Sequence, residues 1–225
     1  MNVLQAAWRI AAKDLRIEMR TREITSSTAL FAVLVVVLAS LSFYLDRNTS
    51  TKMAPGVLWI SVAFSGVLAM GRSWAREREN DAMRGLLLSP IPRPAIYLGK
   101  LVSIFAFLAV VELLLLPLVG ILFHLDLIEV LGEVTLVLFL GTLGFTAAGT
   151  LFGTMTVRTT ARDLAISVAL FPLVAPALLA GVVATREILG GAPPEVVGNW
   201  IRILLAFDLV FLAAGYFLFE PLTSD

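Results

Sequence analysis

The chain contains no cysteine and only one histidine, His124, among its 225 residues. The lack of cysteine excludes disulfides, thiolate metal sites and cysteine nucleophiles. Because there is only one histidine, hydrolytic triads and multi-histidine metal centres are also hard to assemble. No Gly-x-x-x-x-Gly-Lys-Ser/Thr phosphate-binding loop occurs either. We therefore expect a chain that is not an enzyme and binds no cofactor of its own, so that any ATP must be hydrolysed by a partner.

Charge is also scarce. Only 15% of the residues are charged and 59% are hydrophobic, whereas soluble domains are about a quarter charged. This imbalance indicates an integral membrane protein. The formal net charge is zero, so nothing suggests nucleic-acid binding.

Six apolar runs account for most of the chain, each close to the roughly 20 residues that cross a bilayer as a helix. They cover residues 26–45, 55–74, 95–123, 130–157, 164–184 and 200–219. The sequence thus predicts an all-α membrane protein with six transmembrane helices in a single domain, residues 1–225. Aromatic residues near the ends of the runs are expected at the membrane interfaces: Tyr44, Trp59, Trp74, Tyr97, Trp200 and Tyr216.

Residues 1–25 form a different kind of segment. Apolar side chains recur there at helical spacing among many charges, at Leu4, Trp8, Ala11, Leu15 and Met19. This pattern predicts an amphipathic helix too charged to span the membrane. Two roles stay open and are compatible: an anchor on the membrane surface, or a contact for a partner.

The basic residues indicate which side of the membrane each loop faces. With the N-terminus inside, the outer segments hold only four of the 17 basic residues, namely Arg47, Lys52, Arg186 and Arg202. The other 13 lie on the inside. Because lysine and arginine are enriched in cytoplasmic loops, both termini are expected in the cytoplasm.

The longest polar interval, residues 72–100, lies between the second and third runs and carries six basic residues. Residues 76–88 within it read as a short amphipathic helix, ended by Ser89-Pro-Ile-Pro-Arg-Pro. We expect this helix to dock on a cytoplasmic partner through Arg76, Arg78, Asp81, Arg84, Leu86, Leu87 and Leu88. The alternative is a solvated loop, although three water-exposed leucines would be unusual for one.

Several residues inside the predicted spans are candidates for function. Glu112 and Asp208 are costly in hydrocarbon, so each is either a pathway or gating residue or a hydrogen-bonded packing residue. Pro172 and Pro176 would loosen the fifth span. Gly149 and Gly153 form a Gly-x-x-x-Gly pair, which suits close helix packing within the chain or a dimer seam. His124 either ligates a metal or ends its span as a polar cap.

Four stretches resemble the export-type ABC permease family and, within it, the heme export permeases of cytochrome c maturation. They are Met53-Ala-Pro-Gly-Val-Leu-Trp-Ile-Ser, Leu86-Leu-Leu-Ser-Pro-Ile-Pro-Arg-Pro-Ala with Gly99-Lys-Leu, Thr142-Leu-Gly-Phe-Thr, and Phe171-Pro-Leu-Val-Ala-Pro-Ala-Leu-Leu. The family's coupling helix often reads acid-Gly-Ser/Thr-Leu-Glu, whereas this chain has Asn80-Asp-Ala-Met-Arg-Gly. The resemblance implies that residues 76–88 are a coupling helix between spans two and three.

The resemblance also implies an assembly in the bacterial inner membrane. Its expected members are a cytoplasmic ABC ATPase subunit, a heme-handling membrane protein with a tryptophan-rich motif, a small accessory membrane subunit, and a second permease copy. Heme is the implied cargo of the complex, although the ATP cycle could instead release a heme-loaded chaperone. The remaining alternatives are a permease for a drug, lipid or polysaccharide, and a membrane scaffold that transports nothing.

Overall fold

The computed structural model describes the chain except for residues 1, 43–46, 80–84, 87, 157–161 and 224–225. Most of the described residues are helical, and no strand occurs among them. The elements are α1 (Val3–Thr21), α2 (Glu23–Ser42), α3 (Arg47–Glu79), α5 (Arg93–Phe123), α6 (Leu131–Thr156), α7 (Arg162–Leu189) and α8 (Pro194–Thr223).

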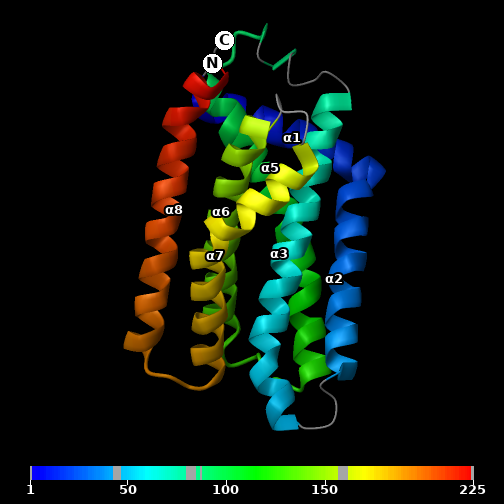
Figure 1. Cartoon of the computed structure of the whole chain (residues 1–225), viewed down its shortest axis with the longest axis vertical. Coiled ribbons are helices and arrows are strands. Elements are labelled where there is room, and N and C mark those ends of the chain that lie inside the picture. The colour runs from blue at the N-terminus through cyan, green and yellow to red at the C-terminus, as the bar shows by residue number, and fades with distance from the viewer. Residues whose placement is uncertain (1, 43–46, 80–84, 87, 157–161, 224–225) are drawn as a thin grey trace.

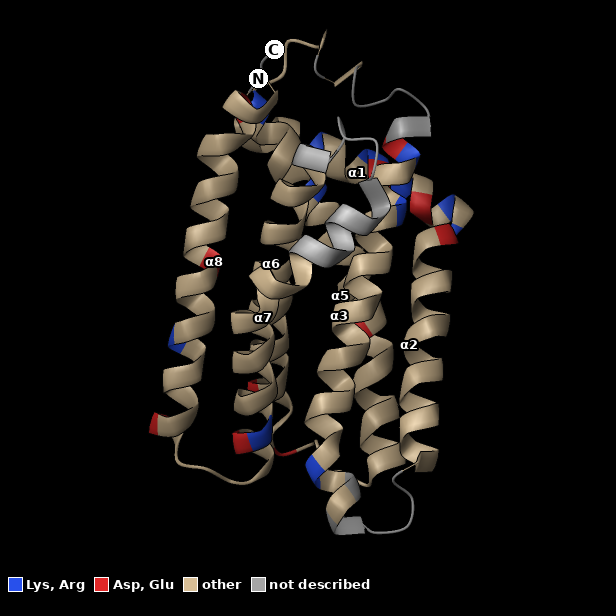
Figure 2. Ribbon diagram, in the orientation of Figure 1, with Lys and Arg blue, Asp and Glu red and all other residues tan. Residues whose placement is uncertain are grey.

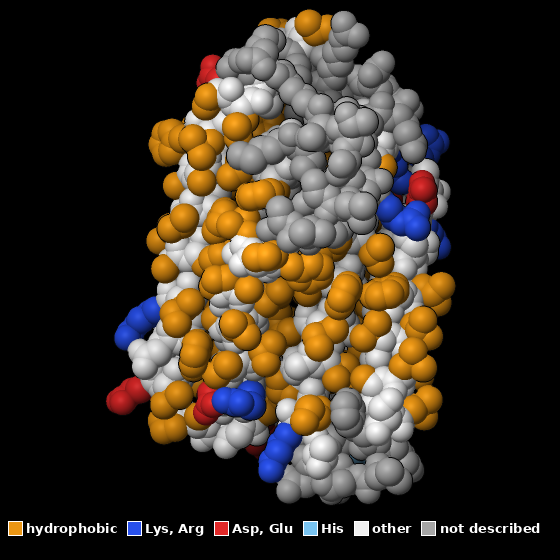
Figure 3. Space-filling view, in the orientation of Figure 1, with side chains coloured by type: hydrophobic (Ala, Val, Ile, Leu, Met, Phe, Trp, Pro, Cys, Tyr) orange, Lys and Arg blue, Asp and Glu red, His pale blue; other side chains and the backbone are white. Residues whose placement is uncertain are grey.

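Six of these helices are long and apolar enough to cross a membrane, in agreement with the six predicted spans. They run side by side along the long axis of the molecule, while α1 lies across one end of the bundle (Figure 1). The beginning of α1 and the end of α8 lie at this same end. Figure 3 shows hydrophobic side chains over the flank of the bundle, and Figure 2 shows charges mainly towards its ends.

Helix α3 is longer than the sequence indicates. It has 33 residues, and at 1.5 Å per residue it measures about 50 Å, against about 30 Å for the hydrocarbon core of a bilayer. The predicted break between a span ending at residue 74 and a separate helix starting at 76 is absent, because α3 continues to Glu79. Arginine and glutamate are good helix formers, so the charged residues 72–79 extend the helix instead of ending it.

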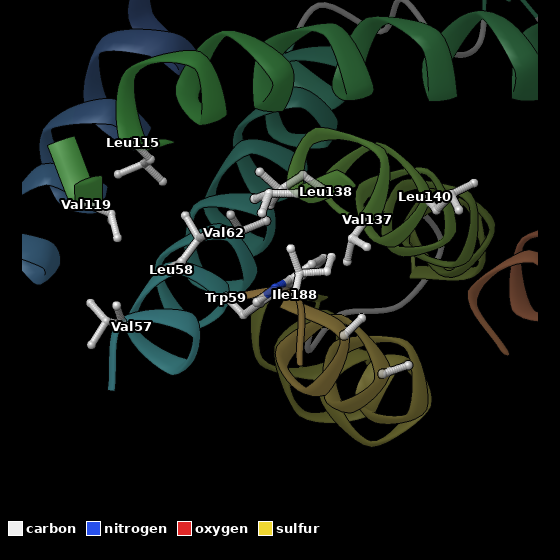
Figure 4. Packing of buried hydrophobic residues seen from close by; sticks show 14 of the residues in the cluster. Val57, Leu58, Trp59, Val62, Leu115, Val119, Val137, Leu138, Leu140 and Ile188 are labelled. Carbon is white, nitrogen blue, oxygen red and sulfur yellow. The ribbon is translucent and has the colours of Figure 1, made fainter. Parts of the chain in front are cut away.

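The two larger hydrophobic clusters among the described residues fill the bundle. One lies towards the α1 end and is built around Met70, Trp74, Tyr97 and Phe145. The other combines side chains of α2, α3, α5, α6, α7 and α8, and Figure 4 shows Trp59, Leu138 and Ile188 converging within it. These contacts hold α3 in the middle of the bundle, against α5, α6 and α7.

The expectation that Trp59, Trp74 and Tyr97 lie at the membrane interfaces is wrong. Each is at most 1% exposed. The indole N–H of Trp59 donates a 2.9 Å hydrogen bond to Thr185 Oγ1 on α7. The Tyr97 hydroxyl lies 3.1 Å from the carbonyl oxygens of Ala147 and Phe211. Because neighbouring helices supply these polar partners, two of these aromatic side chains satisfy their polar atoms in the interior and do not need the membrane surface.

Candidate functional site

Helix α1 turns its acidic side chains towards the protein. Asp14 and Glu18 are 7% and 5% exposed, although carboxylates are rarely buried unless they are paired. The apolar side chains of Leu4, Trp8 and Met19, by contrast, point outward and are 64–75% exposed. The acidic face of α1 therefore packs against the bundle, while its apolar side chains are exposed on the outside of the molecule.

Lys100 on α5 is the centre of these polar contacts. Its Nζ donates a 2.7 Å hydrogen bond to Asp14 Oδ2 and another to the carboxylate of Glu77 on α3. The Ser103 hydroxyl donates to the same oxygen of Asp14 at 3.3 Å. Lysine, aspartate and glutamate thus join α1, α3 and α5 at a point where the Lys100 side chain is only 2% exposed.

A second lysine balances the charge. Lys13 Nζ lies 3.2 Å from Asp14 Oδ1 and 3.4 Å from Glu77 Oε1, so two ammonium groups face two carboxylates. Burial by itself lowers the pKa of Lys13, but the attraction of Asp14 and Glu77 outweighs it and raises the pKa above its ordinary value of 10.5. Lys13 therefore stays charged at neutral pH. We call Lys13, Asp14, Glu77, Lys100 and Ser103 the charge cluster.

Arg76 connects the same end of α3 to the corner between α1 and α2. Its guanidinium lies 3.3 Å from Glu18 and 3.2 Å from Glu23. Glu18 also accepts a 2.7 Å hydrogen bond from the backbone N–H of Thr25, just beyond the corner. Four helices are thereby tied together at one end of the molecule. Charge-assisted hydrogen bonds thus join this end of α3 to α1 and α5.

The residues expected to dock on a partner lie close to this cluster along the chain. Arg76 forms ion pairs with Glu18 and Glu23 of the same chain. Leu86 is half-buried against the core, and Leu88 is 81% exposed. The side chain of Arg78, together with Asp81, Arg84 and Leu87, lies outside the described residues.

Glu112 lies in the middle of α5 and is hydrogen-bonded. The Thr142 hydroxyl on α6 donates to its carboxylate. Glu112 also lines a groove of about 200 Å³ between α5 and α6, together with Leu113, Leu138 and Phe139 among others.

Asp208 on α8 is 3% exposed and faces α6 next to Gly144. Neither of its carboxylate oxygens has a hydrogen-bond partner among the described residues. Thr142 and Gly144 are two positions apart on α6, which places them about 200° apart around the helix. Glu112 and Asp208 therefore touch different faces of α6, and the structure does not bring them together.

The glycines of α6 pack against α3. A methyl group at Gly149 would overlap Met70, and one at Gly153 would overlap the Trp74 indole. Gly149 and Gly153 thus leave room for the Met70 and Trp74 side chains of the same chain. Pro172 and Pro176 lie within α7 on its exposed side, and the helix continues through both.

His124 ends α5 in the left-handed region, with φ 56°. It borders an open groove of about 710 Å³ together with Asp126 and apolar side chains of α5 and the following loop. In the part of the chain that the structure describes, no three histidine, aspartate or glutamate residues gather where a metal ion could bind.

These features together define an α-helical, multi-pass membrane protein with one charged, tightly connected end. The model of the family described as CcmB protein matches residues 5–220, so the chain belongs to this family. Three similar proteins are each named heme exporter protein B. That of Bradyrhizobium diazoefficiens is 26% identical over 205 residues, 91% of both chains. That of Paracoccus denitrificans is 26% identical over 91% of this chain and 92% of its own. That of Pseudomonas aeruginosa is 23% identical over 92% and 94%.

Proposed function

We propose that this chain is the membrane permease subunit of an ABC-type heme export system in the bacterial inner membrane. The family match over residues 5–220 carries the proposal, and the six apolar helices fit it. ATP hydrolysis belongs to a separate subunit in such a system. The system supplies heme for c-type cytochromes, either by moving heme itself or by releasing a heme-loaded chaperone.

The cytoplasmic side is the end that carries α1, the charge cluster and the end of α8. The excess of basic residues in the segments expected to face the cytoplasm supports this orientation. Helix α1 then lies along the cytoplasmic membrane surface, with Leu4, Trp8 and Met19 towards the lipid.

Residues 76–88 are the contact for the ATPase. Because Glu77 belongs both to this segment and to the charge cluster, a movement of the ATPase reaches α5 through Lys100 and α1 through Lys13. Glu112 and Asp208 are candidates for the pathway or its gate, and Pro172 and Pro176 for a change of shape in α7. The other partners are a heme-handling membrane protein, a small accessory subunit and a second permease copy.

Complementation tests the function. A bacterium lacking its own subunit of this family should regain heme-stained c-type cytochromes when it produces this chain, and should not when the partner ATPase is hydrolysis-dead. Full cytochrome production with the inactive ATPase would contradict an ATP-driven role. In the same assay, Glu112→Gln and Asp208→Leu should lower cytochrome production without lowering the amount of protein in the membrane.

Co-purification tests the docking segment. Arg78→Glu, Arg84→Glu and Leu87→Asp should each remove the ATPase from the purified complex, because a reversed charge or an added carboxylate opposes the contact. Membrane insertion should be unchanged. Lys52→Glu, a charge reversal at the other end of α3, is the matched control and should keep the ATPase bound. Normal binding by all three docking variants would exclude this segment as the contact.

A further inference from the structure

A groove of about 560 Å³ lies beside the corner at which α1 leads into α2, and no role described above uses it. Its walls are apolar along most of their length: Leu15, Met19, Ala29, Ala106, Phe107, Val110 and Leu114. Polar side chains line it only near the corner: Glu18, Arg22, Thr25 and Ser26. The groove is therefore amphipathic along its axis, with one polar end.

Among the residues that the structure describes, Arg22 is the one basic residue lining the groove. The acids around it are already neutralised, since Glu18 pairs with Arg76, and Glu23 pairs with Arg76 and Arg72. Arg22 itself is exposed, and its guanidinium has no ion pair among the described residues. Its backbone is held in the left-handed region, φ 52°, where its N–H donates to the carbonyl of Glu18. A fixed corner thus presents a free cation at the polar end.

The groove extends from the charged end of the molecule into the membrane. Arg22 directly precedes Glu23, where the first membrane-spanning helix begins. On α5 the groove runs from Ala106 to Leu114, eight positions, or about 12 Å along a helix. That is about two fifths of the roughly 30 Å hydrocarbon core of a bilayer. The apolar part therefore lies where lipid chains are the surrounding solvent.

The exposed charges of α1 and the corner favour an anion. They are Arg9, Arg16, Arg20 and Arg22 together with one acid, Glu23, whose charge is compensated by Arg72 and Arg76. Asp14 and Glu18 are turned into the protein. A lysine or arginine at a membrane surface strengthens attachment to anionic lipid about fivefold. A zwitterionic headgroup gains little of this attraction.

We propose that this groove binds an anionic phospholipid of the leaflet adjoining α1, with one acyl chain between α1, α2 and α5 and the phosphate on Arg22. The guanidinium matches a phosphate with two parallel hydrogen bonds. The bound lipid fills the space between the corner and α5.

Lipid retention tests the proposal on the purified full-length chain. The protein is exchanged into detergent with phosphatidylglycerol or phosphatidylcholine of the same acyl chains, and bound lipids are counted by native mass spectrometry. The wild type should retain about fivefold more phosphatidylglycerol. Arg22→Gln should reduce this to the phosphatidylcholine level. Val110→Trp, at a position that is 53% exposed, should fill the groove and lower retention of both lipids.

Arg9→Gln is the matched control, since Arg9 is exposed on α1 but does not line the groove. It should retain phosphatidylglycerol as the wild type does, and all variants should keep the wild-type melting temperature. Equal retention of the two lipids by the wild type, or equal effects of Arg22→Gln and Arg9→Gln, would overturn the proposal. Displacement of the lipid by one equivalent of protoporphyrin, lost in Val110→Trp, would assign the groove to a porphyrin and overturn it as well.

Discussion

At the scale of single residues, Lys100 is a buried cation shared by two carboxylates. It compensates Asp14 and Glu77 where its own side chain is 2% exposed. Replacing it with an apolar residue leaves two carboxylates facing each other with only the half-buried Lys13 beside them. Removing one partner of a buried ion pair costs roughly 3–5 kcal/mol.

Lys100→Met is therefore expected to lower the melting temperature of the purified protein by about 6 °C or more, at roughly 2–4 °C per kcal/mol for a chain of this size. Lys100→Arg should lose less, since it keeps the charge. Arg72→Gln is the control: Arg72 and Glu23 form a 3.6 Å pair with side chains 46% and 59% exposed, and such surface pairs contribute about 0–1 kcal/mol. A Lys100→Met protein as stable as Arg72→Gln would refute the role given to the cluster.

At the scale of helices, the apolar runs predicted the spans well. The predicted run 95–123 corresponds to α5, Arg93–Phe123, and run 130–157 to α6, Leu131–Thr156. Hydrophobic length is a property of each segment alone, so a single sequence contains it. The charge cluster could not be predicted in this way, because Asp14, Glu77 and Lys100 are distant in sequence and each looks like an ordinary surface residue. The one local signal was the position of Lys100 inside an otherwise apolar run.

The prediction of interface positions for Trp74 and Tyr97 was wrong because contacts between helices that are distant in sequence cannot be seen in a single segment. Trp74 and Tyr97 lie near the ends of apolar runs, as interface residues do, but α3 and α5 extend beyond those runs and carry both side chains into the core. Their partners are glycines on other helices: Gly153 faces Trp74, and Gly215 faces Tyr97. Spacing within one helix shows that a glycine is present. It does not show which large side chain on another helix occupies the space.

The contact between α3 and α6 depends on these small residues. Gly153→Ala places a methyl group against the buried Trp74 indole, and overpacking of this kind costs about 1–3 kcal/mol. Gly132→Ala, on the same helix but with no atom within 4 Å of the added methyl, should instead gain up to about 1 kcal/mol of helix stability. Melting temperatures should thus shift in opposite directions. A shift of the same sign in both variants would contradict this account of the α3–α6 contact.

At the scale of the whole molecule, the orientation in the membrane can be tested cleanly because the chain has no cysteine. Asp126→Cys, in the loop after α5, should react with a membrane-impermeant maleimide from outside intact cells. Glu220→Cys, near the end of α8, should react only after the inner membrane is opened. Labelling of Glu220→Cys in intact cells, with Asp126→Cys protected, would reverse the proposed orientation.

The charge cluster has a consequence for the order in which the protein is assembled. Helix α1 leaves the ribosome before the other helices that the structure describes, but Asp14 and Lys100 are 86 residues apart, and Lys13 and Glu77 are 64 apart. Until α5 has been synthesised and inserted, Asp14 lacks the buried ammonium group of Lys100 and has only the half-buried Lys13 beside it, so burying its carboxylate is costly. We therefore expect α1 to stay at the membrane surface until α5 has been inserted, and to pack against the bundle only then. A nascent chain that ends before Lys100 should leave α1 open to proteases, whereas one that includes all of α5 should protect it.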